Sequence, residues 1–142
     1  MASLVVEKLE RVREANEARA TLFVDTILPS IPDGESVYVY APTVRRAQEV
    51  LALIPDDINL GNVRARSMHQ SEFKYRGDAP HHTVFLDYNE FTQKFWFTFV
   101  YPFLQVGRST VLVENGSVPS KPWFDKFKPQ AYPDCPWKHY KV

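Results

Sequence analysis

The fold of this chain is decided by residues 36–54, which read SVYVYAPTVRRAQEVLALI. Residues 37–40 are all bulky valines or tyrosines, a pattern typical of a strand that is covered on both faces. Pro42 ends this strand, Thr43 is a good N-cap, and apolar residues recur at helical spacing over 44–54. The stretch therefore predicts a buried parallel strand followed by a crossover helix.

The rest of the chain alternates in the same way. An amphipathic helix is predicted over 4–28, strands over 83–86 and 109–114, a long apolar helix over 89–106 bent near Pro102, and possible short strands over 58–60 and 63–66. Residues 67–82 are polar and are interpreted as a loop. This order predicts a single α/β domain over 1–116, with a small, mostly parallel sheet flanked by helices.

Length and composition limit the class of protein. The chain has 142 residues, 17 basic against 17 acidic side chains, 44% hydrophobic residues and a single cysteine. One domain is expected, and neither a uniformly basic nucleic-acid clamp nor a disulfide framework fits these numbers. Because no apolar run approaches the roughly 18 residues of a membrane span, a cytoplasmic protein without membrane contact is expected.

Residues 117–142 have a composition of their own. They contain five prolines, six aromatic residues and no glycine, which predicts an extended C-terminal arm. Lysines alternate there with aromatic residues, a pattern that suits phosphate contacts and base stacking; the alternative is a solvated basic face with aromatics packed back on the domain. The candidate nucleic-acid or partner-binding residues are Arg45, Arg46, Arg64, Arg66, Lys121, Trp123, Phe124, Lys126, Lys128 and Trp137.

The stretch 91–103 contains seven aromatic residues and one charged residue, Lys94. A helix that is apolar all round is buried either in a core or in an interface. We expect a homodimer in which a second copy covers this helix, and a plain core helix is the alternative. The candidate interface residues are Phe95, Trp96, Phe99 and Phe103.

Three segments together resemble the core of helicase and large-terminase ATPases over residues 36–117. Residues 37–50 resemble the "strand, A-P-T, helix" element, which in those families touches the nucleic-acid backbone. Residues 83–87 resemble the Walker B strand, and 110–117 lie where the coupling-motif strand is expected. The chain lacks a G-x-x-x-x-G-K-[ST] phosphate loop, and Tyr88 rather than Glu follows Asp87. The resemblance therefore implies a motor-like core without ATP chemistry.

Asp87 and Glu90 are the strongest catalytic candidates. They lie three residues apart at a strand-to-helix turn, where two carboxylates could hold magnesium or act as a general base. The alternative is a capping box, in which Asp87 or Asn89 caps the helix and Glu90 satisfies an early N–H.

Metal ligation is not favoured elsewhere in the sequence. His69, His81 and His82 with Asp78 fall in the predicted loop, and Cys135 and His139 fall in the proline-rich arm. We therefore expect no metal and no other cofactor.

Taken together, these features predict a non-enzymatic accessory or binding protein in a protein or nucleic-acid-handling assembly. We expect it to act as a homodimer, and its small size and lack of motifs would suit a viral or phage accessory factor. The alternative is a metal-dependent phosphoryl-transfer or nuclease-like enzyme that uses Asp87 and Glu90.

Overall fold

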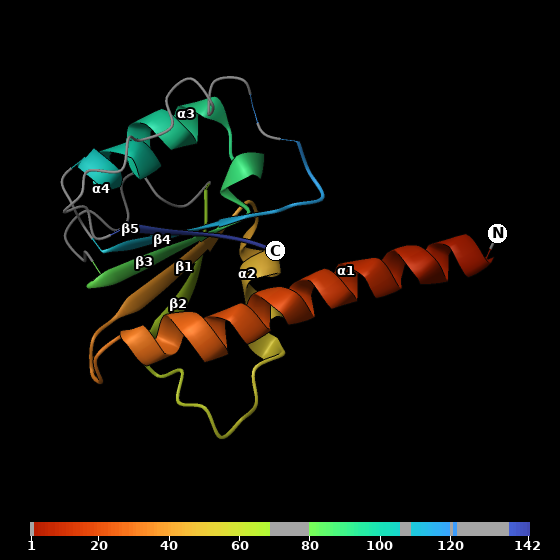
Figure 1. Ribbon diagram of the computed structural model, residues 1–142, viewed down its shortest axis with the longest axis horizontal. Helices are drawn as coiled ribbons and strands as arrows, with labels where there is room; N and C mark the ends of the chain where they lie inside the picture. Colours follow the sequence, from red (N-terminus) through yellow and green to blue (C-terminus); the bar gives the residue numbers. More distant parts are fainter. Residues whose placement is uncertain (1, 69–79, 106–108, 120, 122–136) are drawn as a thin grey trace.

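Five strands form one sheet in the order β2-β1-β3-β4-β5, and every neighbouring pair is parallel. The computed structural model describes residues 2–68, 80–105, 109–119, 121 and 137–142. The strands are β1 (Val37–Ala41), β2 (Val63–Ser67), β3 (His82–Leu86), β4 (Thr110–Glu114) and β5 (Trp137–Lys141) (Figure 1). The predicted α/β class, a single parallel sheet flanked by helices, is confirmed.

Strand β1 is buried along its whole length, as its run of bulky residues predicted. Successive side chains of a strand point to opposite faces. Val37, Val39 and Ala41 therefore belong to the core on one face of the sheet, and Tyr38 and Tyr40 to the core on the other. The two cores together account for the burial of the central strands.

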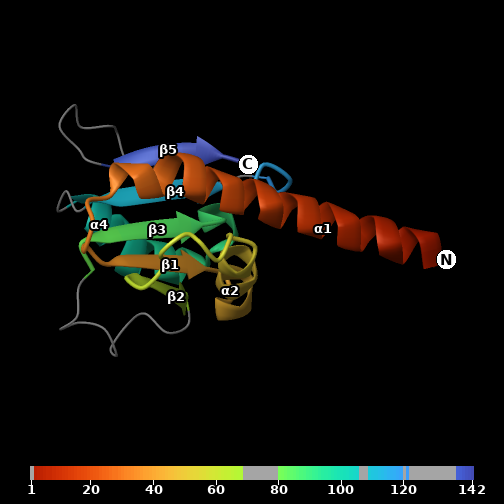
Figure 2. The same ribbon diagram turned by 90° about the horizontal axis from the view of Figure 1, so that it is seen from below.

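The helices divide between these two faces. Helices α1 (Ala2–Leu22) and α2 (Val44–Ala52) cover one face, and α3 (Gln93–Phe95) with α4 (Tyr101–Gln105) covers the other (Figures 1 and 2). The chain passes from β1 through α2 to β2 in one direction, then places β3 on the far side of β1. Because crossovers are right-handed, this reversal moves the later helices to the opposite face and makes the β1–β3 boundary a topological switch point.

The predicted N-terminal helix is confirmed and begins near the chain start. Helix α1 continues into a π-helical turn, η1 (Phe23–Ile27), and a 3₁₀ turn, η2 (Leu28–Ser30). Its C-terminal part packs on the sheet, whereas its N-terminal half projects beyond the body of the domain (Figures 1 and 2). Among the described residues, no helix has the length and apolar character to cross a membrane.

Two predicted elements differ in extent. Residues 58–60 form no strand, although Ile58 and Leu60 still pack against the core, whereas 63–67 join the sheet as β2. The helix predicted over 89–106 begins only at Gln93, because Thr92 accepts a hydrogen bond from the Phe95 N–H and caps it. Residues 88–90 form a separate 3₁₀ turn, η3 (Tyr88–Glu90), and 96–100 are π-helical, η4 (Trp96–Val100).

The end of the predicted C-terminal arm belongs to the sheet. Strand β5 pairs in parallel with β4 from Thr110↔Trp137 to Glu114↔Lys141. An edge position is compatible with a proline-rich segment, since prolines are excluded only from central strands. Residues 117–119 and 121 of the arm are also described, whereas 120 and 122–136, like most of the loop predicted over 67–82, lie outside the described residues.

Phe95 and Trp96 of the aromatic helix lie in the core of a single copy, which corrects their predicted place in a dimer interface. Phe95 and Trp96 are 4% and 0% exposed, and Phe99 is half-buried. The sheet face that bears Tyr40 and Phe85 covers this helix, with Tyr40–Phe99 and Phe95–Phe99 ring centroids 5.1 and 5.2 Å apart. The side chain of Phe103 lies outside the described part of the structure. Since the sheet already buries Phe95 and Trp96, they offer no surface to a second copy.

Candidate functional site

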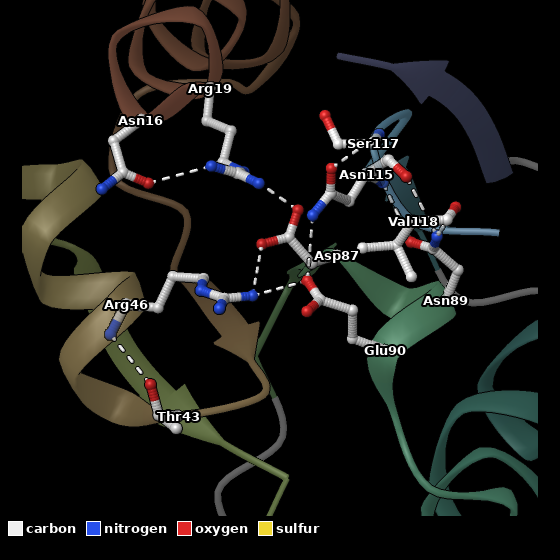
Figure 3. Close-up of polar contacts among 10 residues, drawn as sticks. All are labelled: Asn16, Arg19, Thr43, Arg46, Asp87, Asn89, Glu90, Asn115, Ser117 and Val118. Carbon is white, nitrogen blue, oxygen red and sulfur yellow. Dashed lines mark hydrogen bonds and ion pairs between the residues drawn. The ribbon is translucent and has the colours of Figure 1, made fainter. Parts of the chain in front are cut away.

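Polar side chains from four elements meet at the carboxyl edge of the sheet, beside the β1–β3 switch point (Figure 3). In open parallel sheets this is where ligands bind. We call the group the carboxyl-edge cluster; it consists of Asn16, Arg19, Arg46, Asp87, Glu90 and Asn115.

Asp87 lies at the centre of the carboxyl-edge cluster. It follows β3 directly, is 0% exposed, and has a φ of 55°, the only positive φ among the described non-glycine residues. Its Oδ1 accepts a hydrogen bond from Arg19 Nε at 2.9 Å, and its Oδ2 accepts one from Arg46 Nη1 at 3.1 Å. Left-handed backbone at a non-glycine residue costs free energy, though less for aspartate than for most side chains, and such strain concentrates at functional sites.

Burial determines the electrostatics of this carboxyl group. Removal from water raises the pKa of Asp87 above its ordinary value, against the opposing effect of the nearby Arg19 and Arg46 guanidiniums. Arg19 is itself buried, and its Nη1 donates to Asn16 Oδ1 at 2.9 Å. The ion pair between α1 and the end of β3 is therefore held inside the protein.

Glu90 extends the carboxyl-edge cluster toward β4. It accepts hydrogen bonds from the same Arg46 Nη1 and from Asn115 Nδ2, the latter at 3.2 Å. Arg46 thus bridges both carboxylates that were predicted as catalytic candidates. An approach to either carboxylate by a metal ion would compete with an arginine that already occupies it.

The predicted capping box is wrong. The side chain of Asp87 makes no capping hydrogen bond to η3. Asn89 is directed to the segment after β4 instead: its amide donates to the carbonyls of Asn115 and Val118 at 3.0 and 3.1 Å, and its Oδ1 accepts from the Asn115 N–H at 2.9 Å. Asn89 therefore holds the chain that carries Asn115 into the cluster.

A surface pocket of about 550 Å³ opens beside the cluster, between α1 and the start of α2. We call it the carboxyl-edge pocket; its polar lining includes Arg11, Arg19, Thr43, Arg45, Arg46, Glu49, Asn115 and Ser117. Thr43 caps α2 by accepting from the Arg46 N–H at 3.1 Å, which fixes the first turn of that helix at the pocket. Four arginines and only one carboxylate line this pocket, which suits an anionic ligand.

The structure brings together only part of the predicted binding set. Arg45 and Arg46 lie at the carboxyl-edge pocket. Arg64 and Arg66 pair in register with Tyr38 and Tyr40 and so project from the opposite face of the sheet, where Arg66 lies 4.6 Å from the Tyr38 ring.

The remaining predicted binding residues belong to the C-terminal segment. Lys121 is exposed, and Trp137 is the first residue of β5. Trp123, Phe124, Lys126 and Lys128 lie outside the described residues.

Asn16 and Arg19 were not predicted as site residues, and Asn115 was expected only as part of the segment 110–117 at the end of a predicted strand. A signal for Arg19 was present in the sequence. Arg19 lies four residues before Phe23 on the apolar face of α1, and a charged residue on a buried helix face requires a buried partner.

A second polar group joins β5 to the rest of the domain. The Tyr88 hydroxyl, on a residue that is fully buried, donates to Glu114 Oε1 at 3.1 Å. Since the hydroxyl has one proton, His139 Nε2 is the donor in the second bond, at 2.7 Å. This group links η3, β4 and β5 on the face covered by α3 and α4.

The histidines of the predicted loop are engaged locally. His81 Nδ1 accepts from the Ser36 N–H at 3.0 Å, and His82 lies between Ser109 Oγ and Glu35 Oε1. No group of three or more His, Cys, Asp or Glu side chains suited to a metal occurs in the part of the chain that the structure describes. His69, Asp78 and Cys135 lie outside that part.

Fold and site define a single-domain α/β protein with an all-parallel sheet and a charged cluster at its switch point. No protein-family model, curated protein or solved structure matches the chain.

Proposed function

We propose that this protein is a non-catalytic accessory module that binds phosphate groups of nucleic acid in the carboxyl-edge pocket. The observation that carries the proposal is the lining of that pocket, in which four arginines from α1 and α2 surround a surface hollow at the switch point of the sheet. Phosphate oxygens are the anionic groups that arginine recognises best, because the guanidinium presents several donors in a fixed plane.

The four arginines differ in how many of their hydrogen-bond donors are already engaged by carboxylates. Arg46 makes its two ion pairs through Nη1, which leaves Nη2 and Nε for a ligand. Arg45 is 86% exposed and has only a surface pair with Glu49, an interaction of small net worth. Arg11 is exposed and has no ion-pair partner among the described residues.

The start of α2 adds a second favourable contribution. Thr43 and the first turn of this nine-residue helix lie at the pocket, where the positive end of the helix dipole favours an anion. When Asp87 and Glu90, which lie beneath the pocket, are counted together with Glu49, four guanidiniums face three carboxylates. The surplus of positive charge is small, so we expect binding of modest affinity that weakens as the salt concentration rises.

The same geometry supports a binding role over the catalytic alternative. A general base or magnesium ligand needs an available carboxylate, whereas Asp87 and Glu90 both accept hydrogen bonds from arginine. Thermal-shift titration with magnesium, manganese and nucleotides tests this point. Stabilisation that disappears in Glu90→Gln would favour the phosphoryl-transfer or nuclease-like reading.

The central experiment measures binding of fluorescently labelled single-stranded DNA and RNA by anisotropy, from low to moderate salt. Arg45→Ala is compared with Arg13→Ala, a matched control, since Arg13 forms an equivalent exposed i,i+4 pair with Glu17 away from the carboxyl-edge pocket. We expect Arg45→Ala to weaken binding about tenfold and to lower the salt slope by about one, and Arg13→Ala to bind as the wild type does. A salt-independent affinity, or equal loss in both variants, would contradict the proposal.

A further inference from the structure

The projecting half of α1 carries an exposed apolar surface. Leu4, Val5, Val6, Leu9 and Val12 are 50–66% exposed and make up five of the six large hydrophobic residues that are exposed in the described structure. Figures 1 and 2 both show this part of α1 extending beyond the sheet and the other helices. Such a concentration of exposed apolar side chains marks an interaction surface.

This surface continues the seam by which α1 packs on its own domain. Val5, Leu9 and Val12 are spaced three and four residues apart, and the same spacing leads on to Asn16 and then to the buried Phe23. The body of the domain covers this seam from Asn16 onward and leaves the seam residues before Asn16 exposed. We propose that the projecting half of α1 pairs in antiparallel orientation with the projecting half of α1 of a second copy of this chain.

The charges of α1 favour a second copy as the occupant. The helix has four acidic and four basic residues, so two copies meet without net repulsion. In a parallel pair the flanking residues Lys8 and Arg13 of the two copies would lie opposite each other. An antiparallel pair places Lys8 near Ala15 and Arg13 near Val6 instead. It also keeps the two domains at opposite ends of the helix pair, because each domain lies at the C-terminal end of its own α1 (Figure 1).

The sixth exposed hydrophobic residue fits the same arrangement. Leu53 lines a groove of about 540 Å³ beside α1, together with Ala20, Val24 and Ile54. Arg13, which flanks the seam, lines the groove as well. The N-terminal residues of an antiparallel partner reach this groove, so a two-fold pair buries it twice.

The mixed charge of α1 argues against a lipid surface as the occupant. Helices that lie on membranes are rich in Lys and Arg on the polar face, whereas here acids and bases are equal in number. The inference rests on the exposed apolar side chains of α1 and not on the phosphate proposal, although Val12 and Asn16 of the seam also line the carboxyl-edge pocket.

Sedimentation equilibrium of the full chain at micromolar concentrations tests the pairing. We expect a mass of twice 16.5 kDa for the wild type, and for Leu9→Asp a dissociation constant at least about tenfold higher. Ala18→Asp is the matched control, since it adds the same charge to the exposed polar face of α1 and leaves dimerisation unchanged. Leu53→Asp weakens the dimer to a smaller extent.

The orientation is tested separately by oxidation of Ser3→Cys in a Cys135→Ser background. In an antiparallel pair the two introduced thiols lie far apart and no disulfide-linked dimer forms. Rapid formation of that dimer would show parallel pairing and refute the arrangement. A monomer at all concentrations, or a monomer that co-sediments with neutral or anionic lipid vesicles, would refute pairing altogether.

Discussion

Replacing Arg19 by Met is expected to make the stability of this protein depend steeply on pH. Arg19 and Asp87 are 5% and 0% exposed at their side chains, and Nε lies 2.9 Å from Oδ1. Methionine preserves most of the apolar stem that packs under α1 but removes the charge. Asp87 then remains buried with Arg46 as its ion-pair partner among the described residues.

The size of the effect follows from this geometry. Opposite charges about 4 Å apart attract by about 4 kcal/mol at the effective dielectric constant near a protein surface. Removing one partner of a buried ion pair generally costs about 3–5 kcal/mol, because the other charge stays buried. With Arg46 still in place, we expect Arg19→Met to lower the free energy of unfolding by about 3 kcal/mol at neutral pH.

The sign of the pH dependence follows from the raised pKa of Asp87. A carboxyl group whose pKa is higher in the folded than in the unfolded state stabilises the fold at low pH, and this contribution is lost as pH rises through the folded-state value. Without Arg19 the pKa rises further. The deficit of Arg19→Met should therefore shrink as the pH is lowered toward the ordinary aspartate value.

Urea denaturation followed by circular dichroism, at several pH values, provides the measurement. The comparison uses four proteins: the wild type, Arg19→Met, Asp87→Asn and the double variant. Asparagine tolerates the left-handed backbone at position 87, so the φ of 55° is preserved. Asp87→Asn changes the free energy of unfolding in both backgrounds. We expect this change to be more stabilising by at least about 2 kcal/mol in the Arg19→Met background than in the wild type. Additive effects, or a pH-independent loss in Arg19→Met, would refute the reasoning.

Three further predictions concern the fold around the site, each measured by the midpoint of urea unfolding. Tyr88→Phe should lower the free energy of unfolding by about 1–3 kcal/mol, because it leaves Glu114 and His139 without their shared hydroxyl. An unchanged midpoint would show that this group does not stabilise the position of β5. Phe95→Ala should lower the free energy of unfolding by about 3–5 kcal/mol by opening a core cavity, without altering the dimer dissociation constant. A dimer that dissociates without loss of stability would show that Phe95 lies in an interface after all. Thr43→Ala should cost about 1 kcal/mol through loss of the cap of α2, and a larger loss of nucleic-acid binding than of stability would indicate that its hydroxyl contacts the ligand.

The central elements were predictable because their signals are local. The bulky run at 37–40 predicted a strand covered on both faces, and Thr43 predicted the start of α2, as the structure confirms. Side-chain alternation and helix capping act over a few residues, so the sequence expresses them directly. The start of the aromatic helix was placed too early because Asp-x-x-Glu at 87–90 resembles a cap, whereas Thr92 supplies the actual one.

The carboxyl-edge cluster was only half predictable. Asp87, Glu90 and Arg46 were identified as candidates from their residue types and neighbours, but as members of two separate sites. Arg19 lies 68 positions before Asp87, and no local pattern connects them. Their meeting depends on α1 crossing the carboxyl end of β3, which is a property of the whole topology.

By itself, the sequence determined that this protein alternates helices and strands around a parallel sheet, because periodicity and capping are encoded over a few neighbouring residues. Only the tertiary structure decided which charges neutralise one another, which arginines line the carboxyl-edge pocket, and that the end of the proline-rich segment joins the sheet as β5. The physical reason is that charge pairing, burial and strand registration depend on distances in space, which the order of the strands sets. The same reason moved the expected apolar interface from the aromatic helix, which the sheet buries, to the projecting half of α1, which no described part of the domain covers.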